Sequence, residues 1–344
     1  MMVTVLDNST LGNELTITTP LPDSFEEDEG AVEFHLFIAV ISVALAAFIC
    51  FGNAMTLLAI FRNSLLQTTP SLCIGSLAVA DSLVGLLLLV QGIGDFMLSE
   101  NFLEHNEQLC LSLMSLLFVS VTASMLSMVL VAVDRYIYIS YSLHYTTLVT
   151  RTRSSSLIAL IWVIAMVYGT IPAYTSHYQS AQGCEPTHSF SRTYMIIVHP
   201  TLFFSVCAVT LFLYCQIGRT AVRQRKLINA QKGNIFCADK KIKSNFSRSS
   251  LKLVKLLMAV FGFFFISWCP LLVVSILEYT IHVNHHVLTV CGLLAVMNSG
   301  INFLMLSFMN ADFRNEFRKI LCSRCGARKV YPIAPSTISK SFPD

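Results

Sequence analysis

The chain of 344 residues is 54% hydrophobic and only 12% charged, and its formal net charge is +3. Soluble globular domains contain about 25% charged residues, so this composition excludes an ordinary soluble domain and indicates a membrane protein. A net charge this close to zero gives no support for a nucleic-acid partner.

The N-terminal tail, residues 1–33, is acidic and contains no Lys or Arg. It lacks a basic start followed by an apolar core, so we predict that the first span acts as its own signal anchor. Asn8 begins the sequon Asn8-Ser9-Thr10 and is the predicted glycosylation site.

Residues 34–309 contain the apolar stretches that are long enough to cross a bilayer. A hydrocarbon core about 30 Å thick needs about 20 apolar residues per helix. The stretches show no strict apolar–polar alternation, which a membrane β-barrel would require. The predicted fold class is therefore an all-α bundle of seven transmembrane helices. The predicted spans are Phe34 to Phe61, Ser71 to Leu98, Leu109 to Tyr141, Leu157 to Ala173, Thr193 to Ile217, Leu253 to Leu277 and Val287 to Met309.

The positions of the basic residues predict the orientation of the bundle. Arg192 is the only one of the 23 Lys and Arg residues on the side that carries the N-terminus. Because Lys and Arg collect in cytoplasmic loops, the N-terminus is predicted to be extracellular and the C-terminus cytosolic. We therefore expect a multi-pass protein of the plasma membrane.

Two pairs of cysteines stand outside the apolar core of the spans. Cys110 opens the third span on its outer side and Cys184 precedes the fifth, in a compartment where a disulfide can persist. Such a bridge would hold the outer loop across the mouth of the bundle. Cys322 and Cys325 lie near the cytosolic end without a second pair to complete a zinc site, so acylation is the favoured prediction.

The third span ends with Asp134 and Arg135. At the cytosolic interface the arginine can extend toward water and the aspartate can pair with it. On spacing alone, an ordinary ion pair at a helix end explains these two residues as well as a functional site does.

Seven short pieces in order, each on its expected span, resemble the rhodopsin-like G protein-coupled receptors. The resemblance covers nearly all of the chain, from Gly52 to Phe313. The pieces are LAVAD ending at Asp81, Cys110, DRY at Asp134 to Tyr136, Trp162, Tyr214, FFFISWCP with Phe264, Trp268 and Pro270, and NSGIN with Asn298, Ser299 and Asn302.

The resemblance implies a receptor, not an enzyme, in which Arg135 contacts a heterotrimeric G protein once the sixth helix moves outward. Coupling to the G protein is assigned to Asp134, Arg135, Tyr136, Leu143 and Tyr214. The activation switch is assigned to Phe264, Trp268, Pro270 and Asn302. A sodium ion is assigned to Asp81, Ser124, Asn298, Ser299 and Asn302, with a polar cluster that binds only water as the alternative.

Departures from the family pattern predict weak restraint of the inactive state. The NPxxY piece begins at Asn302 but lacks both the proline and the tyrosine, where Leu306 stands. Without proline the seventh helix keeps a backbone hydrogen bond and has less reason to kink. Ser250 stands where many relatives place an acidic partner for Arg135. We therefore predict basal signalling, and a receptor-like protein without productive coupling is the alternative.

The residues expected to face the ligand cavity are mostly apolar: Leu117, Phe118, Val121, Leu271, Leu272, Ser275, Ala295 and Val296. Leu117 replaces the aspartate of amine receptors, and Val296 replaces the retinal-linking lysine of opsins. Val206 replaces the usual fifth-helix proline, which is similar to the melanocortin, cannabinoid, lysophospholipid and adenosine branch. A lipid-like ligand is predicted, and a peptide that contacts Glu185, Glu278, Asp95 or the acidic N-terminal tail is the alternative.

Residues 310–322 are predicted to form an amphipathic helix along the membrane, because Phe313, Phe317, Ile320 and Leu321 recur at helical spacing. The basic third cytosolic loop suits anionic membrane lipids. Residues 323–344 form the predicted tail, in which Ser336, Thr337, Ser339 and Ser341 are candidate phosphorylation sites for receptor kinases, with arrestin as a further partner.

Two other function classes have weaker support. A transporter would show internal repeats, which are absent from the sequence, and Asp81 is the only acid deep in a span. A membrane enzyme would need convergent catalytic groups, and the nearest candidates are the outer residues Glu278, His282, His285 and His286. A solvated loop explains those residues better than a weak metal site.

Overall fold

The computed structural model describes residues 24–97, 106–175, 184, 190–230, 258–281, 283–309 and 311–322. Several predicted residues lie outside this part of the chain, namely Asn8, Glu185, Ser250, His282, Cys325 and the tail serines.

Within the described ranges, seven helices are long and apolar enough to cross a membrane, as predicted. They are α1 (Ser24–Arg62), α2 (Thr69–Met97), α3 (Glu107–Ser140), α5 (Arg151–Tyr174), α7 (His199–Ala230), the sixth spanning helix (Met258–Leu277) and α9 (His285–Met309). The shorter elements are η1 (Ser64–Leu66), α4 (Tyr145–Leu148), η3 (Tyr194–Val198) and α10 (Ala311–Leu321).

Two helices extend well past the apolar stretches that predicted them. α1 begins at Ser24 rather than Phe34, and α7 continues to Ala230 rather than ending at Ile217. Glu, Lys, Arg and Gln have good helix propensity, so a helix can continue into water beyond the bilayer. Hydropathy therefore located the membrane-spanning part of each helix but not its ends.

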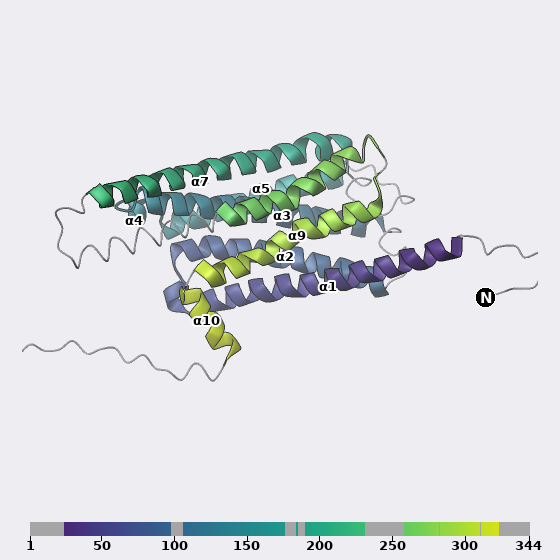
Figure 1. The fold of residues 1–344 in the computed structure, drawn as a ribbon, viewed down its shortest axis with the longest axis horizontal. Coiled ribbons are helices and arrows are strands. Elements are labelled where there is room, and N and C mark those ends of the chain that lie inside the picture. Colours follow the sequence, from purple (N-terminus) through teal and green to yellow (C-terminus); the bar gives the residue numbers. More distant parts are fainter. Residues whose placement is uncertain are drawn as a thin grey trace, which may run out of the picture.

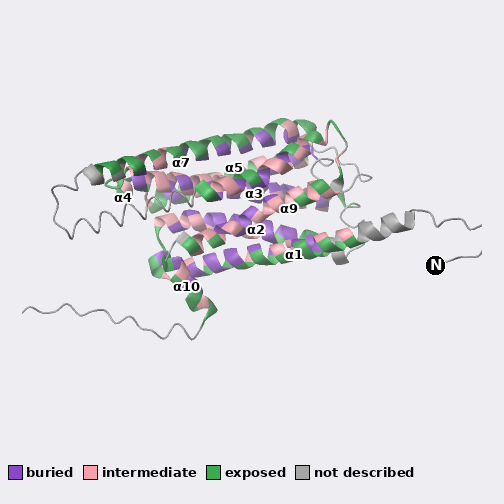
Figure 2. Ribbon diagram, in the orientation of Figure 1, coloured by how far each residue is buried: buried purple, intermediate pink, exposed green. Residues whose placement is uncertain are grey.

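The spanning helices lie alongside one another, and α3 contacts α2, α5 and α7 (Figure 1). The N-terminal end of α1 and the start of α10 lie at opposite ends of the bundle. Figure 2 shows that exposed residues follow the outward sides of α1 and α7. Many of these residues are apolar, such as Phe37 on α1 and Phe212 on α7, which suits a surface in contact with lipid chains.

The fifth spanning helix starts with a turn of π-helix, η3, immediately before Pro200. The His199 N–H bonds to the Tyr194 carbonyl, five residues back rather than four. Proline has no N–H, and its ring clashes with the carbonyl four residues earlier in a regular α-helix. The wider turn accommodates Pro200 and buries Tyr194 and Met195. The fifth helix is therefore irregular near Pro200, and Val206 lies within regular α-helix.

The predicted helix after the seventh span is confirmed as α10, but its apolar face is not turned wholly toward lipid. Phe313 and Phe317 are buried with Met55, Ala59 and Leu66, against α1 and η1. The buried Glu316 carboxylate also accepts hydrogen bonds from Asn63 Nδ2 at 3.1 Å and Lys319 Nζ at 3.0 Å. α10 is thus docked on the bundle by apolar and polar contacts, and Leu321 is its exposed apolar residue.

Gly169 permits a very close approach of α5 to α3. A Cβ atom added to Gly169 would lie 2.4 Å from the Val119 backbone nitrogen and 2.7 Å from its Cα. Small residues at helix contacts allow such packing in membranes. The neighbouring Tyr168 lies beside η3, where its ring is 5.4 Å from that of Tyr194.

We expect Gly169→Ala to destabilise the bundle by about 1–3 kcal/mol, because the new methyl group meets backbone atoms that cannot rotate away. The midpoint of thermal unfolding in detergent measures this effect. Gly218→Ala on α7 is the matched control, since an added Cβ there meets no atom within 4 Å. Equal unfolding midpoints for the two variants would contradict the close approach.

Candidate functional site

The C-terminal end of α3, which the distribution of Lys and Arg predicts to face the cytosol and which we call the cytosolic end, holds an ion pair whose aspartate is bound twice. Arg135 Nε and Nη2 donate to Asp134 Oδ2 at 2.9 and 2.6 Å. Tyr145 OH, from α4, donates to Asp134 Oδ1 at 2.7 Å. Asp134 is 5% exposed, whereas Arg135 is 24% exposed and also lies over the Tyr138 ring. The aspartate is fixed in the protein, and the arginine remains partly accessible from the cytosolic end.

Tyr145 was not predicted from the sequence, because no spacing rule connects a loop tyrosine with the end of α3. Burial and the hydrogen bond to Asp134 raise the pKa of Tyr145 above its ordinary value. The hydroxyl therefore stays protonated and remains a donor at physiological pH. Leu143, in the same loop, is 92% exposed, so this apolar side chain is accessible at this end of the bundle.

A second cluster connects the cytosolic ends of α3, α7, the sixth helix and α9. Tyr214 is buried there, and its ring lies 6.0 Å from that of Phe261. Tyr136 and Met305 pack against the same cluster. Met305 comes just before Leu306, the position of the missing family tyrosine. Apolar packing thus surrounds Tyr214 on the side of α9.

Hydrogen bonds between side chains connect α2, α3 and α5 near this end. Trp162 Nε1 donates to Ser76 Oγ at 3.1 Å. Ser76 Oγ in turn lies 3.1 Å from Ser127 Oγ. These bonds hold α3 against α2 and α5. Trp162 on the fourth span therefore acts as a hydrogen-bond donor between helices.

Asp81 is the centre of a polar cluster in the middle of the bundle and is fully buried. Ser124 Oγ donates to its Oδ1 at 2.7 Å, and Asn302 Nδ2 donates to its Oδ2 at 2.7 Å. Asn53 Nδ2 on α1 donates to the Ser299 carbonyl at 3.2 Å. The cluster therefore joins α1, α2, α3 and α9.

The oxygen atoms of this cluster fit a hard cation such as sodium. Carboxylate oxygens have lone pairs beyond the two hydrogen bonds observed here. Asn298 precedes Ser299 in the sequence. Its Oδ1 atom is buried and accepts no hydrogen bond from the described residues. Buried polar atoms are normally paired, so this oxygen is suited to an ion or a water molecule. Among the described residues, Asp81, Ser124, Ser299 and Asn302 would supply oxygens to sodium, and Asn298 is the fifth predicted ligand.

Most of the predicted ligand residues belong to one apolar cluster in the bundle. Val121, Trp268, Leu272 and Ala295 are buried in it, and Leu117, Leu271 and Val296 pack against it. The Trp268 ring lies 6.4 Å from that of Phe264, and Phe264 lies 5.5 Å from Phe203. Two of the predicted switch residues, Phe264 and Trp268, therefore pack in the same cluster as the predicted apolar ligand residues. Ser275 is buried one turn beyond Leu271, and Pro270 is half-buried.

Phe118 belongs instead to a separate outer cluster. Its ring lies 5.1 Å from Phe190 and 5.1 Å from His199. His199 is buried, and its Nδ1 lies 3.2 Å from Tyr168 OH. This histidine was missed from the sequence, although an ionisable residue inside an apolar span is a signal for a functional site.

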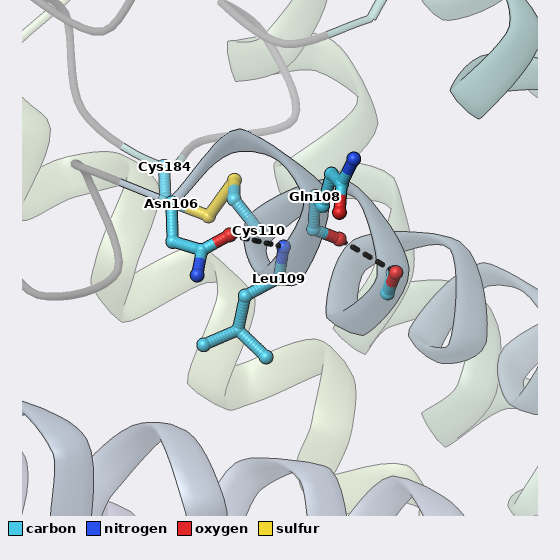
Figure 3. The surroundings of a disulfide bond; sticks show 6 residues. Asn106, Gln108, Leu109, Cys110 and Cys184 are labelled. Atoms are coloured by element: carbon cyan, nitrogen blue, oxygen red, sulfur yellow. Dashed lines mark hydrogen bonds between the residues drawn. A yellow bond between two sulfur atoms is a disulfide. The ribbon is translucent and has the colours of Figure 1, made fainter.

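The disulfide between Cys110 and Cys184 is confirmed, with the two Cα atoms 5.8 Å apart (Figure 3). Asn106 caps α3 beside it, because its side-chain oxygen accepts the Leu109 N–H at 3.1 Å. Cys110 is fully buried and packs with Phe190 and Tyr194. The bridge thus attaches the outer loop to the outer cluster at the start of α3.

Some predicted residues are not brought together. Glu278 lies in the turn after the sixth helix, whereas His286 lies on α9. In the described ranges, no group of three or more His, Cys, Asp or Glu residues is placed to hold a metal ion. Glu278 Oε2 accepts the Val283 N–H at 2.9 Å. Cys322 is exposed at the end of α10.

Comparisons with a family model and with individual known proteins point to the same receptor family. The family described as 7 transmembrane receptor (rhodopsin family) matches residues 52–303. Cannabinoid receptor type 1B of Takifugu rubripes is 26% identical over 312 residues, which cover 85% of this chain and 64% of that receptor. Cannabinoid receptor 1 of Xenopus laevis is 27% identical over 300 residues, 82% of this chain and 62% of that receptor. Melanocortin receptor 5 of Bos taurus is 28% identical over 331 residues, 92% of this chain and 91% of that receptor.

The chain therefore spans less than two thirds of the length of the two cannabinoid receptors that it matches. The predicted similarity to the cannabinoid and melanocortin receptors is confirmed.

We expect sodium to raise the thermal unfolding midpoint of the wild type by a few degrees relative to choline at equal ionic strength. A ligand at about ten times its Kd stabilises by about 1.4 kcal/mol. Asp81→Asn removes the charge that attracts the cation, so the sodium-specific increase should disappear.

Ser124→Ala and Ser120→Ala form a matched pair for this measurement. Both serines lie on α3 and are buried, but only Ser124 bonds to Asp81, whereas Ser120 bonds to its own helix. Only Ser124→Ala should weaken the effect of sodium. An undiminished sodium effect in Asp81→Asn would argue against this site.

Proposed function

The chain belongs to the rhodopsin family of seven-transmembrane receptors, and we propose that it transmits an extracellular ligand signal to heterotrimeric G proteins. The observation that carries this proposal is the restraint on Arg135. Its ion-pair partner is its own neighbour, Asp134, and that carboxylate is held by Tyr145. An arginine restrained within one helix end is released by a local rearrangement.

The location of this restraint favours basal activity. The ion pair of Arg135 with Asp134 lies within α3 and does not join α3 to another spanning helix. In the described part of the sixth helix, no acidic side chain pairs with Arg135. Tyr214 packs among apolar side chains and has no tyrosine partner at Leu306. We propose that the inactive arrangement is weakly favoured, so that some receptors couple without ligand.

Aromatic rings on the sixth helix supply a path from the ligand region to the cytosolic end. Trp268, Phe264 and Phe261 recur on one side of the helix, with centroid distances of 6.4 Å for each successive pair. Phe261 contacts Tyr214 near the end of α3. Closely packed side chains cannot move independently, so displacement of Trp268 shifts the rings below it.

A lipid-like ligand is the better supported class. The side chains around Trp268 are apolar, and burial of a hydrocarbon chain among them stabilises a complex by about 25 cal/mol per Å². A peptide ligand is the alternative, and it would contact acidic groups on the outer side such as Glu278, whose carboxylate accepts the Val283 N–H.

The remaining features of the proposal follow from the assigned topology. An extracellular N-terminus permits glycosylation at Asn8, and a cytosolic C-terminus permits acylation at the exposed Cys322 and at Cys325. Receptor kinases and arrestin are the proposed partners of the tail. The plasma membrane is the proposed location.

Guanine-nucleotide exchange on a panel of purified G proteins tests the proposal. We expect the wild type to accelerate exchange without added ligand, and Arg135→Ala to abolish the acceleration. Arg151→Ala is the control, because Arg151 is an exposed arginine at the cytosolic end of α5. If the wild type accelerates no exchange at matched amounts of folded receptor, the chain is a receptor-like protein without productive coupling.

We expect Tyr145→Phe to raise basal exchange, since a hydrogen bond to a charged group contributes about 1.5–3 kcal/mol and its loss frees Asp134. Tyr138→Phe serves as the comparison, because it removes a nearby hydroxyl but keeps the ring beneath Arg135. The same assay measures both variants. A decrease in basal exchange for Tyr145→Phe would mean that the bond supports the active arrangement instead.

A further inference from the structure

Arg192 bridges the outer ends of two spanning helices. It lies just before η3, and its guanidinium carbon is 5.5 Å from the centre of the Tyr279 ring. Its Nη2 also donates to the Tyr279 carbonyl oxygen at 3.4 Å. Tyr279 follows the sixth helix by two residues. The arginine side chain is exposed but held in one place by these contacts.

The positive charge of Arg192 is not neutralised by these contacts. Among the described residues, no carboxylate forms an ion pair with it. Glu278, the neighbour of Tyr279, directs Oε2 to the Val283 N–H. Burial raises the pKa of Tyr279, so its hydroxyl stays neutral and supplies no negative charge. Since a guanidinium has five N–H donors and Tyr279 accepts one bond, donors remain for a ligand.

The surroundings of Arg192 are apolar. Tyr279 packs against the outer cluster, which includes Phe118, Phe190, Tyr194 and Met195. The disulfide at Cys184 closes the same cluster on its outer side. A single cation beside an aromatic and aliphatic surface matches a ligand that has one anionic group and a long apolar chain.

We propose that Arg192 binds the anionic headgroup, a carboxylate or a phosphate, of an acyl lipid whose hydrocarbon chain contacts the outer aromatic cluster. Arginine recognises both oxyanions through paired, charge-assisted hydrogen bonds. Because Tyr279 already orients the guanidinium, little side-chain freedom is lost when the ligand binds. This inference rests on the proposed function, which places Arg192 on the extracellular side, and it names the chemical class of the ligand.

Binding to the full chain in nanodiscs of phosphatidylcholine tests the proposal without a G protein. The probes are oleate, oleyl phosphate, oleamide and inorganic phosphate. A hydrogen bond to a charged group corresponds to a change in affinity of about tenfold to a hundredfold. We expect oleate or oleyl phosphate to bind the wild type at least about tenfold more tightly than oleamide, and we expect Arg192→Gln to remove that preference.

Two further variants separate loss of charge from loss of folding. Arg192→Lys should keep part of the preference for the anionic lipid, because it keeps the charge without the paired donors. Thr193→Ala, at the adjacent exposed position, should leave binding unchanged. If inorganic phosphate, which has no hydrocarbon chain, binds as tightly as oleyl phosphate, Arg192 forms a general anion site and the lipid assignment is overturned.

Equal affinities of the wild type for oleate, oleyl phosphate and oleamide would overturn the proposal, as would an unchanged preference in Arg192→Gln. Nucleotide exchange on the same samples distinguishes this failure from failure of the proposed function. Binding that depends on Arg192 without any exchange would support the site and contradict signalling. Exchange that depends on Arg135, with no effect of Arg192 on lipid binding, would support signalling and contradict the site.

Discussion

A carboxylate in the middle of an apolar bundle must be satisfied by the protein around it, and this constraint organises the interior here. Asp81 receives hydrogen bonds from Ser124 on α3 and Asn302 on α9. Asn53 extends the cluster to α1 through the Ser299 carbonyl. An unsatisfied polar group in hydrocarbon costs several kcal/mol, so these helices cannot separate freely at this level. The polar centre therefore fixes the register of four helices.

The parts of the molecule above and below this centre are packed differently. Toward the outer side, apolar side chains surround Trp268 and the aromatic rings around Phe118 close the bundle beneath the disulfide. Toward the cytosol, Arg135 and Asp134 are joined to a loop by Tyr145. Apolar packing has little directional preference, whereas the polar contacts are specific. A rearrangement that starts among apolar groups can thus break a small number of polar contacts at the other end.

The two arginines that carry the proposals are held in similar ways. Arg135 lies over the Tyr138 ring, and Arg192 lies over the Tyr279 ring. They differ in their charged partners, because Arg135 pairs with Asp134 whereas Arg192 has no carboxylate partner among the described residues. The first is suited to a switch that opens by breaking an ion pair. The second is suited to a ligand that supplies the missing negative charge.

The sequence alone determined the seven spans, the cysteine pair and the residues that surround Asp81, because each depends on local composition or on a motif with a fixed place on its helix. It did not determine the turn before Pro200, the bond from Tyr145, the separation of Phe118 from Leu117 and Val121, or the docking of α10 through Glu316. The last three depend on how closely two elements approach, as Gly169 shows at the contact of α5 with α3. Hydropathy and spacing describe one helix at a time, so only the tertiary structure could decide which side chains meet between helices.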